Sequence, residues 1–267
     1  VSGLTAFIGV AASYNVDMTK LSTEKYETNT YEITEDFTNI NVNVEMINIT
    51  VMKSETETAS VVCMESKKIK YDVSVSNGVL VVEVDNNRRW YDFSFESVKI
   101  NSHTGDVSLT SSSDEVNIKL STGNIKLENI NIDNASLVTA TGNHYLKNVV
   151  ATNNVFIESS TGTITLNNVD CKNLTAITDT GRVKLTDVIA TGRFEISTET
   201  GGVTLEDSDA SEMNIETSTG SVKGTILTPK IFMARSDTGK INVPETTTGG
   251  ICRIRTSTGN ISITIKG

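Results

Sequence analysis

The dipeptide Thr-Gly recurs at a nearly constant interval between residues 104 and 259, and this repeat restricts the fold more than any other feature of the chain. Nine copies form a periodic series, and the steps between their glycines are 18 to 20 residues long. A period repeated this often indicates a repeat architecture. The repeated glycines are Gly105, Gly123, Gly142, Gly162, Gly181, Gly201, Gly220, Gly239 and Gly259.

Apolar residues occupy matching positions in these copies. Valine or isoleucine stands two residues after the glycine in eight copies, and His144 takes this place in the ninth. Mostly apolar positions also stand four residues after the glycine, and five and seven residues before it. Within each segment these positions are two residues apart, which predicts strands with one buried face.

The period is too short for a strand–helix–strand unit, which needs about 30 residues. It predicts an all-β fold, a parallel β-solenoid (β-helix) of about nine coils in which each coil stacks on the next. Each glycine is expected to form a corner, because glycine adopts positive φ and tolerates close approach of another backbone. A second corner is expected six residues after the glycine, where a side chain can close the turn, at Asn129, Asn148, Asn168, Asp187 and Asp207.

Two kinds of polar residue are expected to lie inside the coils. Ser or Thr stands three residues before the glycine in eight of nine copies. This position shares the parity of the inward apolar positions, so its hydroxyl should point into the corner and satisfy backbone groups there. His144 is interpreted as a partly buried replacement for valine or isoleucine.

Residues 24–97 lack the repeat and predict a separate β region. A hairpin is expected around Asn77-Gly78, a strong turn signal between two alternating strands. We therefore divide the chain into a leader or anchor remnant at 1–23, an N-terminal β cap at 24–97 and the solenoid at 98–267. Two interpretations fit the aromatic cluster in this cap: it covers the open first coil, or it is an exposed binding patch for a glycan or peptide. Its members include Trp90, Tyr91 and Phe93.

The first 16 residues carry no charge, which is a little short of the roughly 20 residues that span a bilayer. They are either a flexible leader or the outer end of a transmembrane or signal segment. Three cysteines, Cys63, Cys171 and Cys252, give no even-numbered disulfide framework and are expected to be buried thiols.

Charge and residue chemistry argue against several function classes. A net charge of −10 disfavours binding to nucleic acid or to an anionic membrane surface, both of which need clustered Lys and Arg. The sequence contains two histidines and no catalytic triad order, P-loop or zinc-protease motif. A calcium ladder is not expected either, since Asp106 is the one carboxylate directly after a repeat glycine. We expect no enzymatic activity, no cofactor and no metal.

The nine [ST]-T-G-x-[IV]-x-[LI] coils resemble the bacterial DUF4097 family, whose members carry the name "putative adhesin". Residues Lys20–Ile33 and Arg88–Phe93 share the resemblance, which extends over most of the chain from about residue 20. It implies a right-handed β-helix ectodomain on the extracellular face of a bacterial cell membrane, often behind one N-terminal membrane helix. The family has no established catalytic or binding residues to assign.

The sequence thus predicts a non-enzymatic cell-surface module that adheres to, or binds, a glycan or protein ligand. Two alternatives remain open. One is a carbohydrate-active β-helix enzyme, because pectate-lyase-like enzymes are also solenoids. The other is a self-assembling structural solenoid, because Asn260–Gly267 ends the chain as an uncapped strand. The sequence specifies neither a particular ligand nor an oligomeric state.

Overall fold

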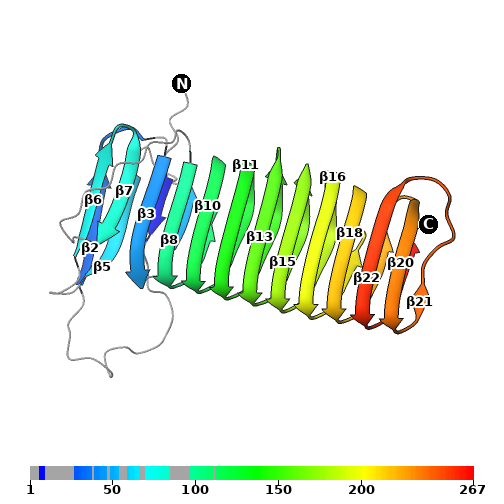
Figure 1. Cartoon of the computed structure of the whole chain (residues 1–267). Helices are drawn as coiled ribbons and strands as arrows, with labels where there is room; N and C mark the ends of the chain where they lie inside the picture. The colour runs from blue at the N-terminus through cyan, green and yellow to red at the C-terminus, as the bar shows by residue number, and fades with distance from the viewer. Residues whose placement is uncertain are drawn as a thin grey trace.

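The computed structural model describes residues 6–9, 27–37, 39–46, 49–53, 59–65, 70–84, 97–110 and 112–267. Every regular element in these ranges is a strand, which confirms the all-β prediction. The strands form one elongated β-solenoid, with the N- and C-terminal regions at opposite ends (Figure 1). None of the described elements is a helix that could cross a membrane.

The solenoid presents two series of parallel strands, one on each long face. The first series contains β8 (Ser97–Thr104), β10 (Ser113–Thr122), β13 (Asn154–Thr161), β15 (Asn173–Thr180) and β18 (Asp209–Thr219). The second contains β9 (Val107–Leu109), β12 (His144–Ala151), β14 (Ile164–Cys171), β17 (Val203–Glu206) and β19 (Val222–Ile226). Two long strands contribute to both series, β11 (Ile125–Thr141) and β16 (Val183–Thr200).

Equivalent repeat positions lie side by side in neighbouring coils, as the sequence predicts. Ile118 of β10 pairs with Ile100 on one side and Leu137 on the other. All three side chains are fully buried. The inward positions of successive coils therefore build one continuous apolar core along the axis.

The second corner is where the sequence places it. Asn129, Asn148, Asn168, Asp187 and Asp207 all have φ between 49° and 54°. Asparagine and aspartate tolerate this left-handed region better than most residues. The Asn148 amide also donates to Asn129 Oδ1 at 2.7 Å, and the Asn168 amide donates to Asn148 Oδ1 at 2.9 Å. The corners are thus linked from coil to coil by side-chain hydrogen bonds.

Close backbone approach, rather than positive φ, is what the repeat glycines share. Gly123 and Gly142 have φ of 144° and 154°, but Gly162 and Gly181 are not among the glycines with positive φ. A Cβ added at Gly181 would lie 1.9 Å from the carbonyl oxygen of Gly162 in the preceding coil. The same glycine oxygen accepts a hydrogen bond from Thr178 Oγ1 at 3.0 Å, so the repeated hydroxyl does point into the corner.

At the C-terminal end the coils do not follow the order of the sequence. β22 (Gly250–Thr258) lies between β18 and β20 (Lys230–Thr238), and β23 (Ile261–Ile265) lies between β19 and β21 (Ile241–Asn242). Figure 1 shows β22 on the inner side of β20. The expectation that each coil stacks on the next is therefore wrong for the last two repeats. The final strand β23 is not an outer edge; β20 and β21 are.

The number of turns is about eight, slightly fewer than the nine expected. The outermost copy, around Gly239, continues into a strand of two residues, β21. This copy contributes less than a full coil to the stack.

The N-terminal end contains a second coil that is out of sequence order. β3 (Asn39–Met46) lies between β8 and β7 (Val79–Val84), and β4 (Ile49–Lys53) pairs with β9. Two strands of the region assigned to the cap, β3 and β4, thus stack in parallel register on the solenoid. β7 forms the expected antiparallel hairpin with β6 (Tyr71–Ser76) around Asn77-Gly78.

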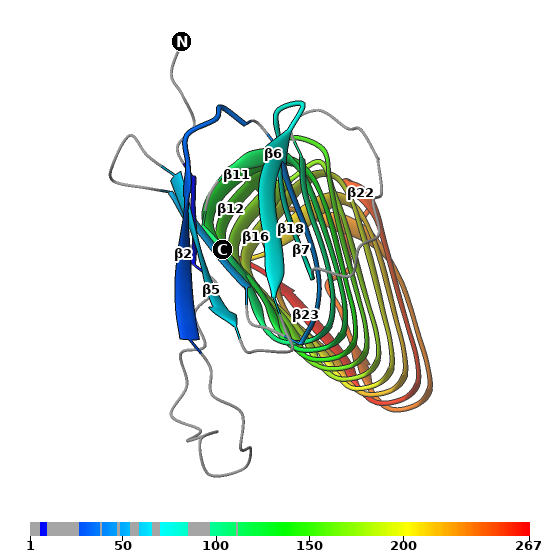
Figure 2. The same ribbon diagram turned by 90° about the vertical axis from the view of Figure 1, so that its left-hand side faces the viewer.

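The remaining strands lie against this end of the solenoid. β2 (Glu27–Ile33) and β1 (Ala6–Gly9) both pair with β5 (Ala59–Glu65), and β1 also pairs with β4. Seen along the axis, the coils superpose as flattened rings, with the β6–β7 hairpin in front and β2 and β5 at one side (Figure 2).

Candidate functional site

The aromatic residues predicted as a binding patch, Trp90, Tyr91 and Phe93, lie outside the described residues, so that patch stays a prediction. The other residues singled out in the sequence, the nine repeat glycines, form coil corners. In the part of the chain that the structure describes, no group of three or more His, Cys, Asp or Glu side chains is arranged to hold a metal ion.

His144 lies in the apolar core, as its place in the repeat predicts. It pairs with Ile125 in one neighbouring coil and with Ile164 in the other, and its side chain is fully buried. Neither ring nitrogen has a hydrogen-bond partner of normal geometry. Burial lowers the pKa of the imidazole to about 4, and the nearby Leu137 backbone offsets part of this effect. A neutral ring without access to solvent cannot serve a surface ligand.

The three cysteines are unpaired and buried, as expected. Burial raises the pKa of each thiol to about 12. Because the thiolate is the reactive form of cysteine, none of the three is suited to nucleophilic catalysis.

A polar groove of about 540 Å³ lies across four neighbouring strands at the C-terminal end. Its volume is within the range of ligand sites, about 300–1,000 Å³. The strands are β16, β18, β22 and β20, in the order in which they stack. Its lining contains no aliphatic or aromatic residue: Ser197, Thr198, Glu199, Glu216, Thr217, Ser218, Arg235, Asp237, Arg255, Thr256 and Ser257.

The threonines of the groove are fixed by the solenoid. Thr198, Thr217 and Thr256 are each at most 5% exposed. Their hydroxyls donate to the carbonyl oxygens of glycines in neighbouring coils, at distances between 2.9 and 3.1 Å. The bonds of Thr217 and Thr256 link β18 to the corner after β16, and β22 to the corner after β18. Ser236 of β20 makes the equivalent bond to the Gly259 carbonyl oxygen after β22, at 2.9 Å.

Charged side chains of both signs stand above these threonines. Arg255 Nη1 lies 3.5 Å from Glu216 Oε1 across two strands, and Arg235 Nη2 lies 3.2 Å from Asp237 Oδ1 within β20. All four side chains are about half exposed or more. Such exposed ion pairs contribute little to stability. Each of these side chains can therefore leave its ion pair and bind a ligand group with little loss of folding free energy.

The groove was not predicted from the sequence, although a signal for it exists. Four residues before the repeat glycine, the last three copies all carry a charge, whereas both charged and uncharged residues occur in the copies before them. The last three residues are Glu216, Arg235 and Arg255, and the earlier ones include Lys119, Val138, Glu158, Ile177 and Ser197. This change marks a charged patch at one end. Its arrangement depends on the inserted coil, because sequence order would have placed Arg235, rather than Arg255, beside Glu216.

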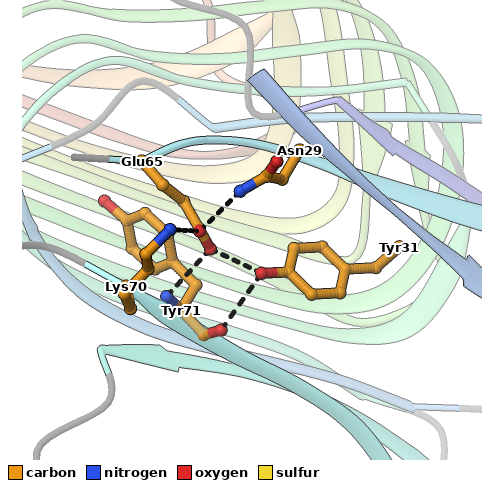
Figure 3. Close-up of polar contacts among 5 residues, drawn as sticks. All are labelled: Asn29, Tyr31, Glu65, Lys70 and Tyr71. Atoms are coloured by element: carbon orange, nitrogen blue, oxygen red, sulfur yellow. Dashed lines mark hydrogen bonds and ion pairs between the residues drawn. The ribbon is translucent and has the colours of Figure 1, made fainter. Parts of the chain in front are cut away.

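A second polar cluster lies in the N-terminal strands (Figure 3). The Glu65 carboxylate is 1% exposed and accepts from Asn29 Nδ2 at 2.7 Å, Tyr31 OH at 2.5 Å, Lys70 Nζ at 2.8 Å and the Tyr71 amide at 3.1 Å. Burial alone would raise the pKa of Glu65, but the four hydrogen bonds lower it to about 2. The buried carboxylate of Glu65 is satisfied by these four donors, so we interpret the cluster as a junction of β2 and β5 with β6 rather than as a ligand site.

Sequence comparison places the repeat in a known family. The model of the Toastrack DUF4097 family matches residues 37–193 and 153–267. The chain belongs to the DUF4097 family. The family match begins at residue 37, directly before β3, and so includes the coil that lies out of sequence order at the N-terminal end.

A crystal structure of a "putative adhesin" from Bacteroides fragilis NCTC 9343 is similar at 15% identity and a TM-score of 0.46, with 90% of this chain and 97% of that chain covered. No curated protein matches the sequence.

Proposed function

We propose that this DUF4097 protein is a non-enzymatic module of the bacterial cell surface that binds a glycan in the groove over β16, β18, β22 and β20. The groove itself is the observation that carries the proposal. Its lining of hydroxyls, carboxylates and guanidinium groups suits a ligand rich in hydroxyl groups. A tether through a segment at or before the N-terminus would hold the solenoid at the extracellular face of the membrane.

An extended ligand fits this groove better than a compact one. The lining residues repeat from coil to coil, and neighbouring strands in a sheet are about 4.8 Å apart. The groove therefore offers a row of similar donors and acceptors to successive units of a chain. Each contact is exposed to water and weak, so affinity would come from several contacts made together.

The geometry also supports a binding role over glycan hydrolysis. Glycosidases use a carboxyl group whose raised pKa lets it act as a general acid, and burial is the usual cause of such a shift. Glu216 and Asp237 are instead 47% and 57% exposed and are paired with arginines. The proposed role is therefore recognition of the glycan without chemical conversion.

A glycan array probed with the purified protein tests this function. Glu216→Gln and Arg255→Gln should each reduce binding to the glycans that the unmodified protein retains, by about tenfold for the loss of one charge-assisted contact. Glu206→Gln is a matched control, because Glu206 forms an exposed ion pair with Lys184 at 3.2 Å outside the groove. Undiminished binding by both groove variants, or turnover of a retained glycan, would contradict the proposal.

A further inference from the structure

The C-terminal end of the solenoid exposes an unpaired strand edge. Among the described strands, β20 pairs in parallel register with β22 alone. The Thr238 carbonyl accepts from the Gly259 amide at 3.0 Å, so it points toward β22. Because backbone groups alternate in direction along a strand, those of Met233, Arg235 and Asp237 point toward the open edge.

Exposed apolar side chains gather at this same end. Six large apolar side chains of the described residues are exposed, and four of them belong to the last coils: Leu227, Ile231, Met233 and Ile241. The inward positions of the outermost coil are incompletely covered as well, since Phe232, Ala234 and Val243 are only partly buried. An apolar patch beside an unpaired edge marks a surface that another chain can cover.

The described strands at the opposite end of the solenoid offer no matching surface. There β7 is covered by β6 in an antiparallel hairpin. The exposed positions of β6 are Asp72, Ser74 and Ser76, and no exposed large apolar side chain is found among the described residues of this end. Stacking of the C-terminal end of one molecule on the described β6 strand of the next would therefore leave the apolar patch against polar groups.

We infer that β20 pairs with β20 of a second copy, antiparallel across a twofold axis, so that two solenoids join at their C-terminal ends. The charges on this strand complement themselves. Arg235 and Asp237 lie two residues apart on the same face, so an axis through Ser236 sets Arg235 opposite Asp237 of the partner subunit. The twofold axis produces this contact twice, as in other symmetric dimers, so each β20 edge is occupied by the other copy.

The pairing would also extend the groove. Arg235 and Asp237 stand at its outer limit on β20, so the same row of polar groups would continue onto the second copy. The inference itself rests on the strand edge and the apolar patch, and it holds whether or not the groove binds a glycan.

Sedimentation velocity of the purified protein, with charge-reversed variants, tests the inference. The unmodified protein should sediment as a dimer, whereas Arg235→Asp and Asp237→Arg should each sediment as monomers because like charges then face one another. An equimolar mixture of the two variants should restore the dimer, since an all-acidic edge meets an all-basic one. Met233→Glu should also yield a monomer, and Val150→Glu, at an exposed apolar residue on the side of the solenoid, should not.

Circular dichroism and a thermal melt of each variant establish that it is folded. A monomeric unmodified protein at every accessible concentration overturns the inference, and so does a dimer that persists in both charge-reversed variants. Failure of the mixture to restore the dimer also overturns it, because the exposed Arg235 and Asp237 would then not be facing each other.

Discussion

Lys230 and Asp209 form a buried ion pair although another strand separates the two that carry them. Lys230 Nζ lies 2.6 Å from Asp209 Oδ1, and both side chains are at most 8% exposed. β22 enters between β18 and β20 at Gly249-Gly250, where an added Cβ would lie 1.9 Å and 1.7 Å, respectively, from a backbone oxygen. The absence of side chains at this dipeptide lets β22 pass beside the ion pair. Thr228 and the Ala210 amide supply further hydrogen bonds to Asp209.

We predict that Asp209→Ala destabilises the protein by about 3–5 kcal/mol, because it leaves a buried ammonium group without its partner. Chemical denaturation at neutral pH measures the change. Lys266→Ala is the control: this lysine pairs with Asp207 at 2.5 Å but is 54% exposed, so its removal should change the stability little. Equal effects of the two substitutions would show that the inserted coil does not depend on the buried pair.

Gly181→Ala should destabilise the solenoid by about 3 kcal/mol, because the added Cβ collides with the Gly162 carbonyl of the preceding coil. Gly181 is not among the positive-φ glycines, so this variant isolates the effect of backbone approach from that of φ. Gly202→Ala is the control, since its Cβ would lie 3.0 Å from the nearest backbone oxygen. A thermal melt of Gly181→Ala that matches that of Gly202→Ala would refute the steric explanation.

His144 should make the protein less stable in mild acid. The pKa of the imidazole falls from 6.5 in the unfolded chain to about 4 in the core, so unfolding takes up a proton below pH 6.5. Stability should therefore decline between about pH 6.5 and 4, by up to roughly 3 kcal/mol. His144→Ile should remove this decline in denaturation curves recorded across the range, and His103→Ala, at an exposed histidine, should retain it.

Glu65 should act in a lower pH window and on the N-terminal strands. Its pKa is lowered to about 2, so the stability contributed by the carboxylate is present above pH 4.5 and is lost as the pH falls toward 2. Glu65→Gln should show this loss already at pH 7, measured as faster amide exchange in β2, β5 and β6. Glu32→Gln, at an exposed position of β2, provides the comparison; equal exchange in both variants would contradict the assigned role.

The periodic part of the fold was accessible from the sequence because one physical requirement repeats in every coil. A glycine is needed wherever backbones approach closely, and an asparagine or aspartate suits the left-handed corner at positions such as Asn148. Each requirement acts within one coil or between adjacent coils, so it selects the same residue type at the same position of every copy. The period, the buried face and both corners follow from those positions.

The order of the coils could not be predicted in the same way. The copies around Gly239 and Gly259 carry the same pattern, so either could stack on the copy around Gly220. The choice depends on single features outside the repeat, namely Gly249-Gly250 and the Lys230–Asp209 pair. The candidate groove could not be predicted for the same reason, because its charged side chains lie together only in the observed stacking order of the coils.

The inserted coils determine how the solenoid would carry a mechanical load. β22 and β23 have a neighbouring strand on each side, as does β3 at the other end. A pull applied to β23 must therefore break hydrogen bonds to the strands on both of its sides. A strand of an outermost coil would separate from only one neighbouring strand. A solenoid pulled at one of these inserted coils would therefore resist unravelling at the point where the force enters.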